Sequence, residues 1–109
     1  MGLAAATFRL MYLTQFRNDL ESKITTITES KMALSKTIQE MISMGNDMDT
    51  DSDFVKQLNA KKDRLDALDK KLDMQLELYN SQLKMVDQEI QSATSLRDSS
   101  ISRSFKYGQ

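Results

Sequence analysis

Four aspartates at alternate positions are the residues of this chain best placed to do chemistry, because carboxylates spaced in this way can hold a calcium ion. They are Asp47, Asp49, Asp51 and Asp53. An EF-hand loop also needs a glycine at the position of Ser52 and a bidentate glutamate at the position of Leu58, and neither is present. The sequence therefore predicts an acidic, solvated turn whose carboxylates favour the N-terminal end of the next helix, with no dedicated metal site. Weak binding of a cation by this turn stays open.

The overall composition argues against catalysis. The chain has no histidine and no cysteine, so it lacks the usual general base, the thiolate nucleophile and most ligands for transition metals. Its formal net charge is −1, which gives no electrostatic reason to expect binding to nucleic acid. We therefore expect a protein that is not an enzyme, carries no cofactor and does not bind nucleic acid.

An apolar repeat of seven residues runs through most of the 109-residue chain and is interrupted once, at the acidic turn. In the first half its core positions are Leu3, Ala6, Leu10, Leu13, Arg17, Leu20, Ile24, Ile27, Lys31, Leu34, Ile38 and Met41. In the second half they are Val55, Leu58, Lys62, Leu65, Asp69, Leu72, Leu76, Tyr79, Leu83, Val86, Ile90, Ala93 and Arg97. This rhythm is typical of long helices that lie against other helices.

The repeat and its interruption predict an all-α fold, an antiparallel two-helix hairpin of the coiled-coil type that oligomerises. The predicted parts of this single domain (residues 1–109) are a helix at about 4–44, the acidic turn at 45–53, a helix at about 54–103 and a short tail at 104–109. The chain has no proline and three glycines, so little in it would stop a helix. We expect Gly45 and Asn46 to end the first helix in a left-handed conformation. The β-branched segment 23–28 favours a strand by itself, but the repeat passes through it and predicts a helix.

Charged side chains occupy several of the nominal core positions, namely Arg17, Lys31, Lys62 and Asp69. A buried charge without a partner would be costly. We expect these residues either to fix the register of the helices or to reach water at the edge of a thin core. The charged stretch that contains them in the second helix is interpreted as solvated surface, supported by pairs one turn apart such as Lys62 with Asp66.

The predicted turn brings the two ends of the chain together, and these ends carry most of the aromatic residues and a surplus of cations. The candidate assembly interface consists of Phe8, Leu10, Tyr12, Leu13, Phe16, Ile101, Arg103 and Phe105. One end of the hairpin is then apolar and basic, while the turn is acidic. If the acidic turn of one subunit lies near the basic ends of the next, the contact is heterologous, and its repetition gives a filament or a ring. The alternative is that the terminal aromatics close the open end of a discrete bundle.

In this layout the chain resembles the small helical-hairpin proteins that polymerise into bacterial type III secretion needles and, more loosely, the coiled-coil ends of flagellar axial proteins. The shared features are an apolar N-terminal helix without a cleavable signal, a polar turn, and the terminus Ile101-Ser102-Arg103-Ser104-Phe105. The chain is longer than most needle subunits, and its turn lacks their prolines. The resemblance implies a self-assembling structural subunit, exported without a cleaved signal, whose terminal helices pack around a lumen. Its implied partners are copies of itself and an export chaperone or secretion channel.

Other functions fit the same repeat. A cytosolic coiled-coil adaptor or helical chaperone would form a discrete oligomer and use the repeat as a groove for a partner helix. A membrane-surface helix at residues 2–17 is a further interpretation, motivated by Arg9 and Arg17 beside leucines and aromatic residues. No transmembrane segment is expected, because the same two arginines interrupt the most hydrophobic stretch. The expected location is extracellular or at the cell surface for an exported filament, and cytoplasmic for an adaptor.

Overall fold

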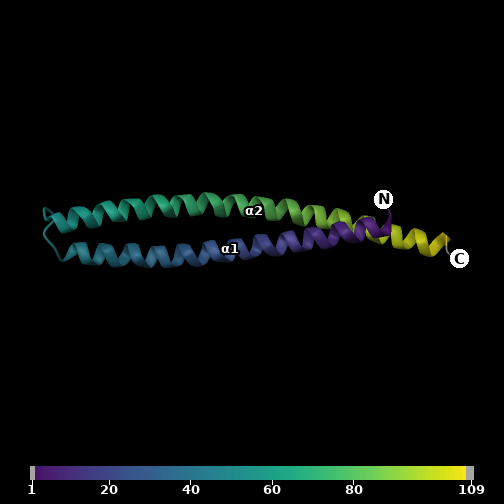
Figure 1. Cartoon of the computed structure of the whole chain (residues 1–109), viewed down its shortest axis with the longest axis horizontal. Helices are drawn as coiled ribbons and strands as arrows, with labels where there is room; N and C mark the ends of the chain where they lie inside the picture. The colour runs from purple at the N-terminus through teal and green to yellow at the C-terminus, as the bar shows by residue number, and fades with distance from the viewer. Residues whose placement is uncertain (1, 108–109) are drawn as a thin grey trace. The chain divides into compact units, whose positions relative to one another are not determined.

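A computed structural model gives the backbone of residues 2–107 and the side chains up to residue 103. Two long helices account for nearly all of it: α1 covers Leu3–Asn46 and α2 covers Asp53–Tyr107 (Figure 1). No strand occurs in the described part of the chain. The prediction of an all-helical fold built on two long helices is confirmed. Oligomerisation stays a prediction.

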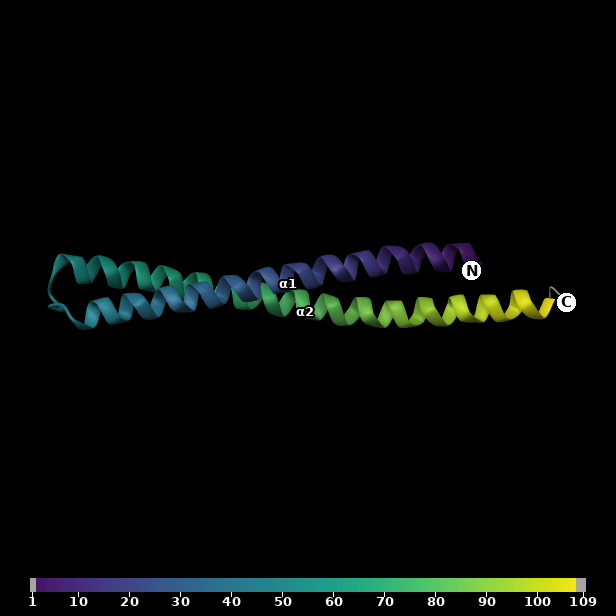
Figure 2. The same cartoon turned by 90° about the horizontal axis from the view of Figure 1, so that it is seen from below.

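The chain divides into two compact units, and each unit contains a piece of both helices. Unit 1 consists of Met1–Lys23 and Tyr79–Gln109, and unit 2 consists of Ile24–Leu78 with the connecting turn. In unit 1 the beginning of α1, purple in both views, lies beside the end of α2 (Figures 1 and 2). The prediction that the whole chain forms a single domain stays a prediction.

The buried residues of α1 all lie at predicted heptad core positions. The buried residues of this helix recur every seventh position, and they are Ala6, Leu13, Leu20, Ile27 and Leu34. The core positions between them are half-buried, apart from the exposed Leu3, and the remaining α1 residues up to Met44 are exposed. A strict period of seven therefore does describe the face that α1 turns toward α2.

Unit 1 holds the best-defined core of the chain. Leu13 and Leu20 of α1 form a buried cluster with Val86 and Ala93 of α2. Half-buried apolar residues pack around this cluster, and they are Leu10, Tyr79, Leu83 and Ile90. Lys23 adds a cation–π contact, with its Nζ atom 5.4 Å from the centre of the Tyr79 ring. These pairings join the start of one helix to the end of the other, so the two helices run antiparallel within this unit.

The core of unit 2 combines buried apolar residues with a half-buried lysine that is paired with carboxylates. Ile27 and Leu34 of α1 and Val55 and Leu58 of α2 are its buried apolar residues. At the half-buried core position between the two α1 residues, Lys31 forms ion pairs with carboxylates of α2. The helices are again antiparallel here, because residues early in the α1 segment meet residues late in the α2 segment.

The predicted left-handed end of the first helix is wrong. Neither Gly45 nor Asn46 has a positive φ, and α1 continues through both of them. The helix ends instead in a tighter final turn, in which the Met48 amide donates to the Gly45 carbonyl over 3.3 Å. Gly45 lies close to α2, since a Cβ atom there would be 3.4 Å from Cδ2 of Leu58.

The start of α2 has a well-formed cap. Ser52 precedes the helix, and its Oγ atom accepts a hydrogen bond of 3.2 Å from the amide of Val55. This is the geometry of an N-cap, in which a side-chain oxygen satisfies an amide of the first turn. Asp53 is the first residue of α2 and lies at the positive end of the helix dipole. The helix therefore begins one residue before the predicted start at Phe54.

Two further features follow from the helical backbone. In the β-branched segment the Thr28 hydroxyl donates to the carbonyl of Ile24 over 2.8 Å, which satisfies the side chain without leaving the helix. At the other end of the chain α2 reaches Tyr107, so most of the predicted tail is helical. No proline or glycine occurs between Gly45 and Gly108, and nothing in that stretch requires α2 to end earlier.

Candidate functional site

The predicted assembly residues of the first helix divide into an exposed group and a core group. Phe8 is 71% exposed, and Tyr12 and Phe16 are also exposed. Leu10 is half-buried and Leu13 is buried in the core of unit 1. The candidate interface grouped surface aromatics with two leucines that the heptad pattern itself assigns to core positions. A substitution at Leu13 therefore alters the folding of unit 1 as well as any contact between copies.

Tyr12 and Phe16 form a pair on the surface of α1. Their ring centres are 6.3 Å apart, and the two planes are inclined by only 11°. One residue of an α-helix corresponds to about 100° of rotation, so these two side chains, each one position before a core residue, lie on one flank of α1. Met11 follows the core residue Leu10 and lies on the opposite flank. It is also exposed.

Ile101 and Arg103 are exposed on the last turns of α2 for which side chains are described. Phe105, the remaining predicted interface residue, lies outside the residues whose side chains are described. Ser100, just before this group, is buried and continues the heptad pattern beyond Arg97. The predicted interface thus extends over both helices of unit 1, as far as the described part allows.

Three arginines of unit 1 pair with carboxylates of the same unit. Arg9 pairs with Glu89 over 3.3 Å, and Arg97 pairs with its neighbour Asp98 over 3.4 Å. Arg17 forms ion pairs with Asp87 over 3.6 Å and with Glu21 over 4.0 Å. Among the chain-end cations with described side chains, Arg9, Arg17 and Arg97 are therefore paired inside unit 1, whereas Arg103 forms no ion pair with a described residue.

Two shallow grooves lie on opposite flanks of unit 1. The first, with a volume of about 780 Å³, is lined by residues that include Leu10, Met11, Thr14, Ile90 and Thr94. The second, with a volume of about 650 Å³, is lined by residues that include Arg9, Met85, Glu89, Ala93 and Leu96. In the first groove the half-buried core residues Leu10 and Ile90 remain reachable from outside. Both grooves are open surfaces suited to a protein side chain or helix, not enclosed ligand cavities.

In unit 2 the charged core residues keep contact with water and find partners. Lys31 is one quarter exposed and pairs with Asp69 over 3.4 Å and with Asp73. Lys62 pairs with Asp66 one turn along α2, over 3.2 Å. These pairs agree with the expectation that charges at core positions reach the edge of the seam. Because Lys31 of α1 contacts two carboxylates of α2, it also favours one register of the two helix segments in unit 2.

The acidic turn belongs to unit 2 and is organised by its own hydrogen bonds. The Asp49 side chain accepts a bond of 3.2 Å from the amide of Asp51, and the Asp49 carbonyl accepts a bond of 3.1 Å from the amide of Ser52. Among the described residues, no group of three or more acidic side chains is arranged to hold a metal ion. Asp47, Asp51 and the other turn carboxylates are exposed.

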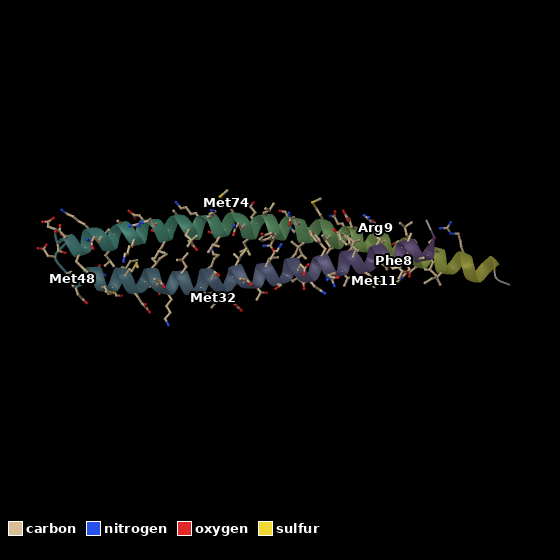
Figure 3. The ribbon with its side chains drawn as sticks, in the orientation of Figure 1. Phe8, Arg9, Met11, Met32, Met48 and Met74 are labelled. Carbon is tan, nitrogen blue, oxygen red and sulfur yellow. The ribbon has the colours of Figure 1, made fainter. Side chains whose placement is uncertain are left out.

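The sequence reasoning missed a second set of exposed apolar side chains, which lies in unit 2. Met32 on α1 and Met74 on α2 are each about 70% exposed, and both point away from the partner helix (Figure 3). Leu68 and Leu78 on α2 are exposed as well. All four occupy positions outside the heptad core, and this is the signal that could have identified them.

No protein-family model, curated protein or solved structure matches this chain. Within the described residues, neither helix contains a stretch apolar and long enough to cross a membrane.

Proposed function

We propose that this chain is a structural subunit that assembles with copies of itself into a filament or tube. The observation that carries the proposal is the distribution of exposed apolar side chains around both helices. Exposed apolar groups mark surfaces that a partner can cover, and a single partner on one face would leave those on the other sides in water. In a subunit with several neighbours, each neighbour covers a different side.

In unit 1 the exposed apolar side chains lie on three sides of α1. Tyr12 and Phe16 lie on one flank, and Met11 lies on the other. Phe8 is two positions after the core residue Ala6 and therefore lies on the outer side, away from α2. A single partner helix against one flank would leave the rest of this surface in water.

The same holds for unit 2 considered by itself. Met32 follows the core position Lys31 as Met11 follows Leu10, whereas Met74 lies on the outer side of α2, so a contact on one side of the helix pair would not cover both methionines (Figure 3). Methionine is an adaptable residue that packs against varied surfaces. Two exposed methionines on different sides of the helix pair are suited to contacts with different neighbours.

The small core gives a reason for assembly. A helix pair has a single seam, and Leu20 is the one large side chain among the described residues that is fully buried. A chain with so little buried apolar area is marginally stable alone, and contacts between copies would add to its stability. In this proposal the protein acts through assembly and not through catalysis. Export through a secretion channel, with the help of a chaperone, belongs to the same proposal and rests on the resemblance to needle subunits.

A second candidate function is a coiled-coil adaptor or helical chaperone that forms a discrete oligomer. The groove that exposes Leu10 and Ile90 favours it, because a partner helix in that groove would complete the seam of unit 1. This function predicts a fixed stoichiometry at every concentration. The filament predicts a mass that increases with concentration.

The test is negative-stain electron microscopy over a concentration series, with the mass measured by light scattering on the same samples. We expect filaments of uniform diameter above a critical concentration. A fixed small oligomer throughout would favour the adaptor, and a single chain of 12.5 kDa at every concentration would refute both.

A matched pair of variants separates apolar contact from the mere addition of charge. Phe8→Asp and Gln15→Asp each place one carboxylate on the same outer line of α1, seven residues apart, and both original side chains are exposed. Only Phe8→Asp removes an apolar contact. We expect it to raise the critical concentration at least about tenfold, while Gln15→Asp has a small effect. Equal behaviour of the two variants would count against an apolar interface at this line.

A further inference from the structure

A row of exposed cations and leucines follows one flank of α2 in unit 2. It consists of Lys61, Arg64, Leu68, Lys71 and Leu78, and we refer to it as the basic strip. Steps of three or four residues, or of seven, keep successive members of the row close to one line on a helix. At 1.5 Å per residue the strip is about 25 Å long. Its two leucines are 45% and 54% exposed, so the strip combines positive charge with accessible apolar surface.

The cations of the basic strip differ from Lys31 and Lys62, the two cations of unit 2 that form ion pairs among the described residues. Lys31 and Lys62 are half-buried and form ion pairs with carboxylates. Within the part of the chain with described side chains, none of the three strip cations forms an ion pair. Arg64 donates only to a backbone carbonyl of its own helix, that of Ala60, over 3.4 Å. The strip thus presents three positive charges that the unit itself does not neutralise.

The register of α2 keeps acidic residues off the strip. The carboxylates of this part of the helix lie on the core line or on the opposite flank, and they are Asp63, Asp66, Asp69, Asp73 and Glu77. By its heptad position, Glu40 is the one charged residue that α1 contributes to the strip side of unit 2. It forms no ion pair among the described residues. The charge of this flank is therefore predominantly positive.

The acidic turn has the complementary composition. Its four aspartates are exposed, and within the described residues none of them forms an ion pair. Met48 within the turn and Phe54 just after it are also exposed, by 48% and 44%. The turn therefore offers negative charge beside apolar side chains, as the strip offers positive charge beside apolar side chains. The two surfaces belong to the same unit but do not pair with each other in one chain.

The chain ends are a poorer match for the acidic turn than the sequence indicated, because Arg103 is the one chain-end cation with a described side chain that forms no ion pair among the described residues. Arg9, Arg17 and Arg97 already pair with carboxylates of unit 1. A second carboxylate surface would have to compete with these existing partners. The basic strip has no such partners to displace.

We propose that the acidic turn of one copy docks on the basic strip of a second copy. The two surfaces are different parts of the molecule, so the contact is heterologous, and each copy can use its turn on one neighbour and its strip on another. Repetition of this contact generates an open chain of subunits or a closed ring. The inference rests on the proposed self-assembly and identifies the surfaces that drive it.

The experiment exchanges the sign of each surface. A strip-reversed variant carries Lys61→Glu, Arg64→Glu and Lys71→Glu, and a turn-reversed variant carries Asp47→Lys, Asp49→Lys and Asp51→Lys. Asp53 is retained because it begins α2. Each variant alone brings like charges together, and we expect its critical concentration to rise at least about tenfold. A 1:1 mixture restores opposite charges at every contact, so we expect assembly close to that of the wild type.

Two controls isolate the position of the charges from their number and from folding. Lys56→Glu with Lys70→Glu changes two exposed lysines on the opposite flank of α2, and it matches Lys61→Glu with Lys71→Glu in composition and net charge. We expect the strip pair to weaken assembly and the opposite-flank pair to leave it within about twofold. Circular dichroism checks that each variant is helical. If loss of the Asp49 turn lowers helicity, the milder turn variant Asp47→Lys with Asp51→Lys replaces the triple one in the mixture.

The outcomes separate this inference from the proposed function. Wild-type filaments together with unchanged assembly of both reversed variants would refute the turn-to-strip contact and leave self-assembly standing. No assembly of the wild type at any concentration would refute both. Failure of the helical reversed variants to rescue each other would also overturn the contact. Vesicles of phosphatidylserine and phosphatidylcholine test the other occupant: if the wild type binds them through the strip and forms no polymer, the strip serves an anionic surface instead.

Discussion

Replacing Leu20 by alanine tests whether the seam of unit 1 is the main source of stability in this protein. Leu20 is 2% exposed and is the most fully buried large side chain in the described part of the chain. It belongs to the cluster with Leu13, Val86 and Ala93, in which both helices take part. Its truncation should therefore weaken the contact between α1 and α2 and not only the local helix, because alanine is itself an excellent helix former.

The expected loss follows from burial and from the cavity that is left. The substitution removes about three methylene equivalents, each worth about 0.8 kcal/mol when buried. Some cavity cost is added, although a seam between only two helices can partly collapse. We expect the free energy of unfolding to fall by about 2 to 3 kcal/mol. A protein of this size typically has about 5 to 15 kcal/mol in total, so the variant should unfold at a clearly lower denaturant concentration.

The assay is urea unfolding followed by circular dichroism, at a concentration where light scattering gives the mass of a single chain. Leu96→Ala is the matched control, because it is the same substitution in the same unit at a residue that is 42% exposed. We expect the control to lose less than half as much as Leu20→Ala. Losses that differ by less than about 0.5 kcal/mol would refute the argument that the heptad seam carries the stability. A changed urea slope would point to an altered unfolded or native ensemble instead.

Three further predictions concern the turn and the surface charges. Gly45→Ala should stabilise the chain by about 0.4 to 1 kcal/mol, since the glycine is helical and a Cβ atom there meets only ordinary contact distance at Leu58; destabilisation would mean that the approach of the helices is tighter than this. Ser52→Ala should cost about 1 kcal/mol in urea unfolding through loss of the α2 cap, and no change would show that water replaces the serine. A double-mutant cycle of Arg9→Ala and Glu89→Ala should give a coupling of about 0.2 to 1 kcal/mol that disappears in 1 M salt. A coupling that survives such salt would contradict the exposed character of this pair.

The helices themselves were predictable because their signal is local and repeated. The seven-residue apolar period identified Leu13, Leu20 and Ile27 as seam residues, and the structure buries all three. The helix ends were less predictable. Glycine is the residue that most often ends a helix, but Gly45 keeps a helical conformation. The helix ends instead with a hydrogen bond from the Met48 amide to the Gly45 carbonyl. Residue type alone does not decide between these two ways of ending a helix.

The candidate surfaces were only partly predictable. Phe8 and Tyr12 could be assigned to the outside by their heptad positions, whereas grouping them with Leu13 mixed surface and core. The charge at the chain ends was misleading for a different reason. Arg9 and Glu89 are 80 residues apart in the chain, and nothing in the sequence states that they meet.

The sequence by itself determined that this protein consists of two long helices and which side of each helix faces the seam. Both follow from a period of seven residues, which acts within each helix and needs no knowledge of the other. The tertiary structure decided which charges are paired and which are free. Arg17 and Lys31 are neutralised across the seam, whereas the cations of the basic strip are not. That difference depends on the register of two antiparallel helices, and a register is a property of the pair and not of either helix alone.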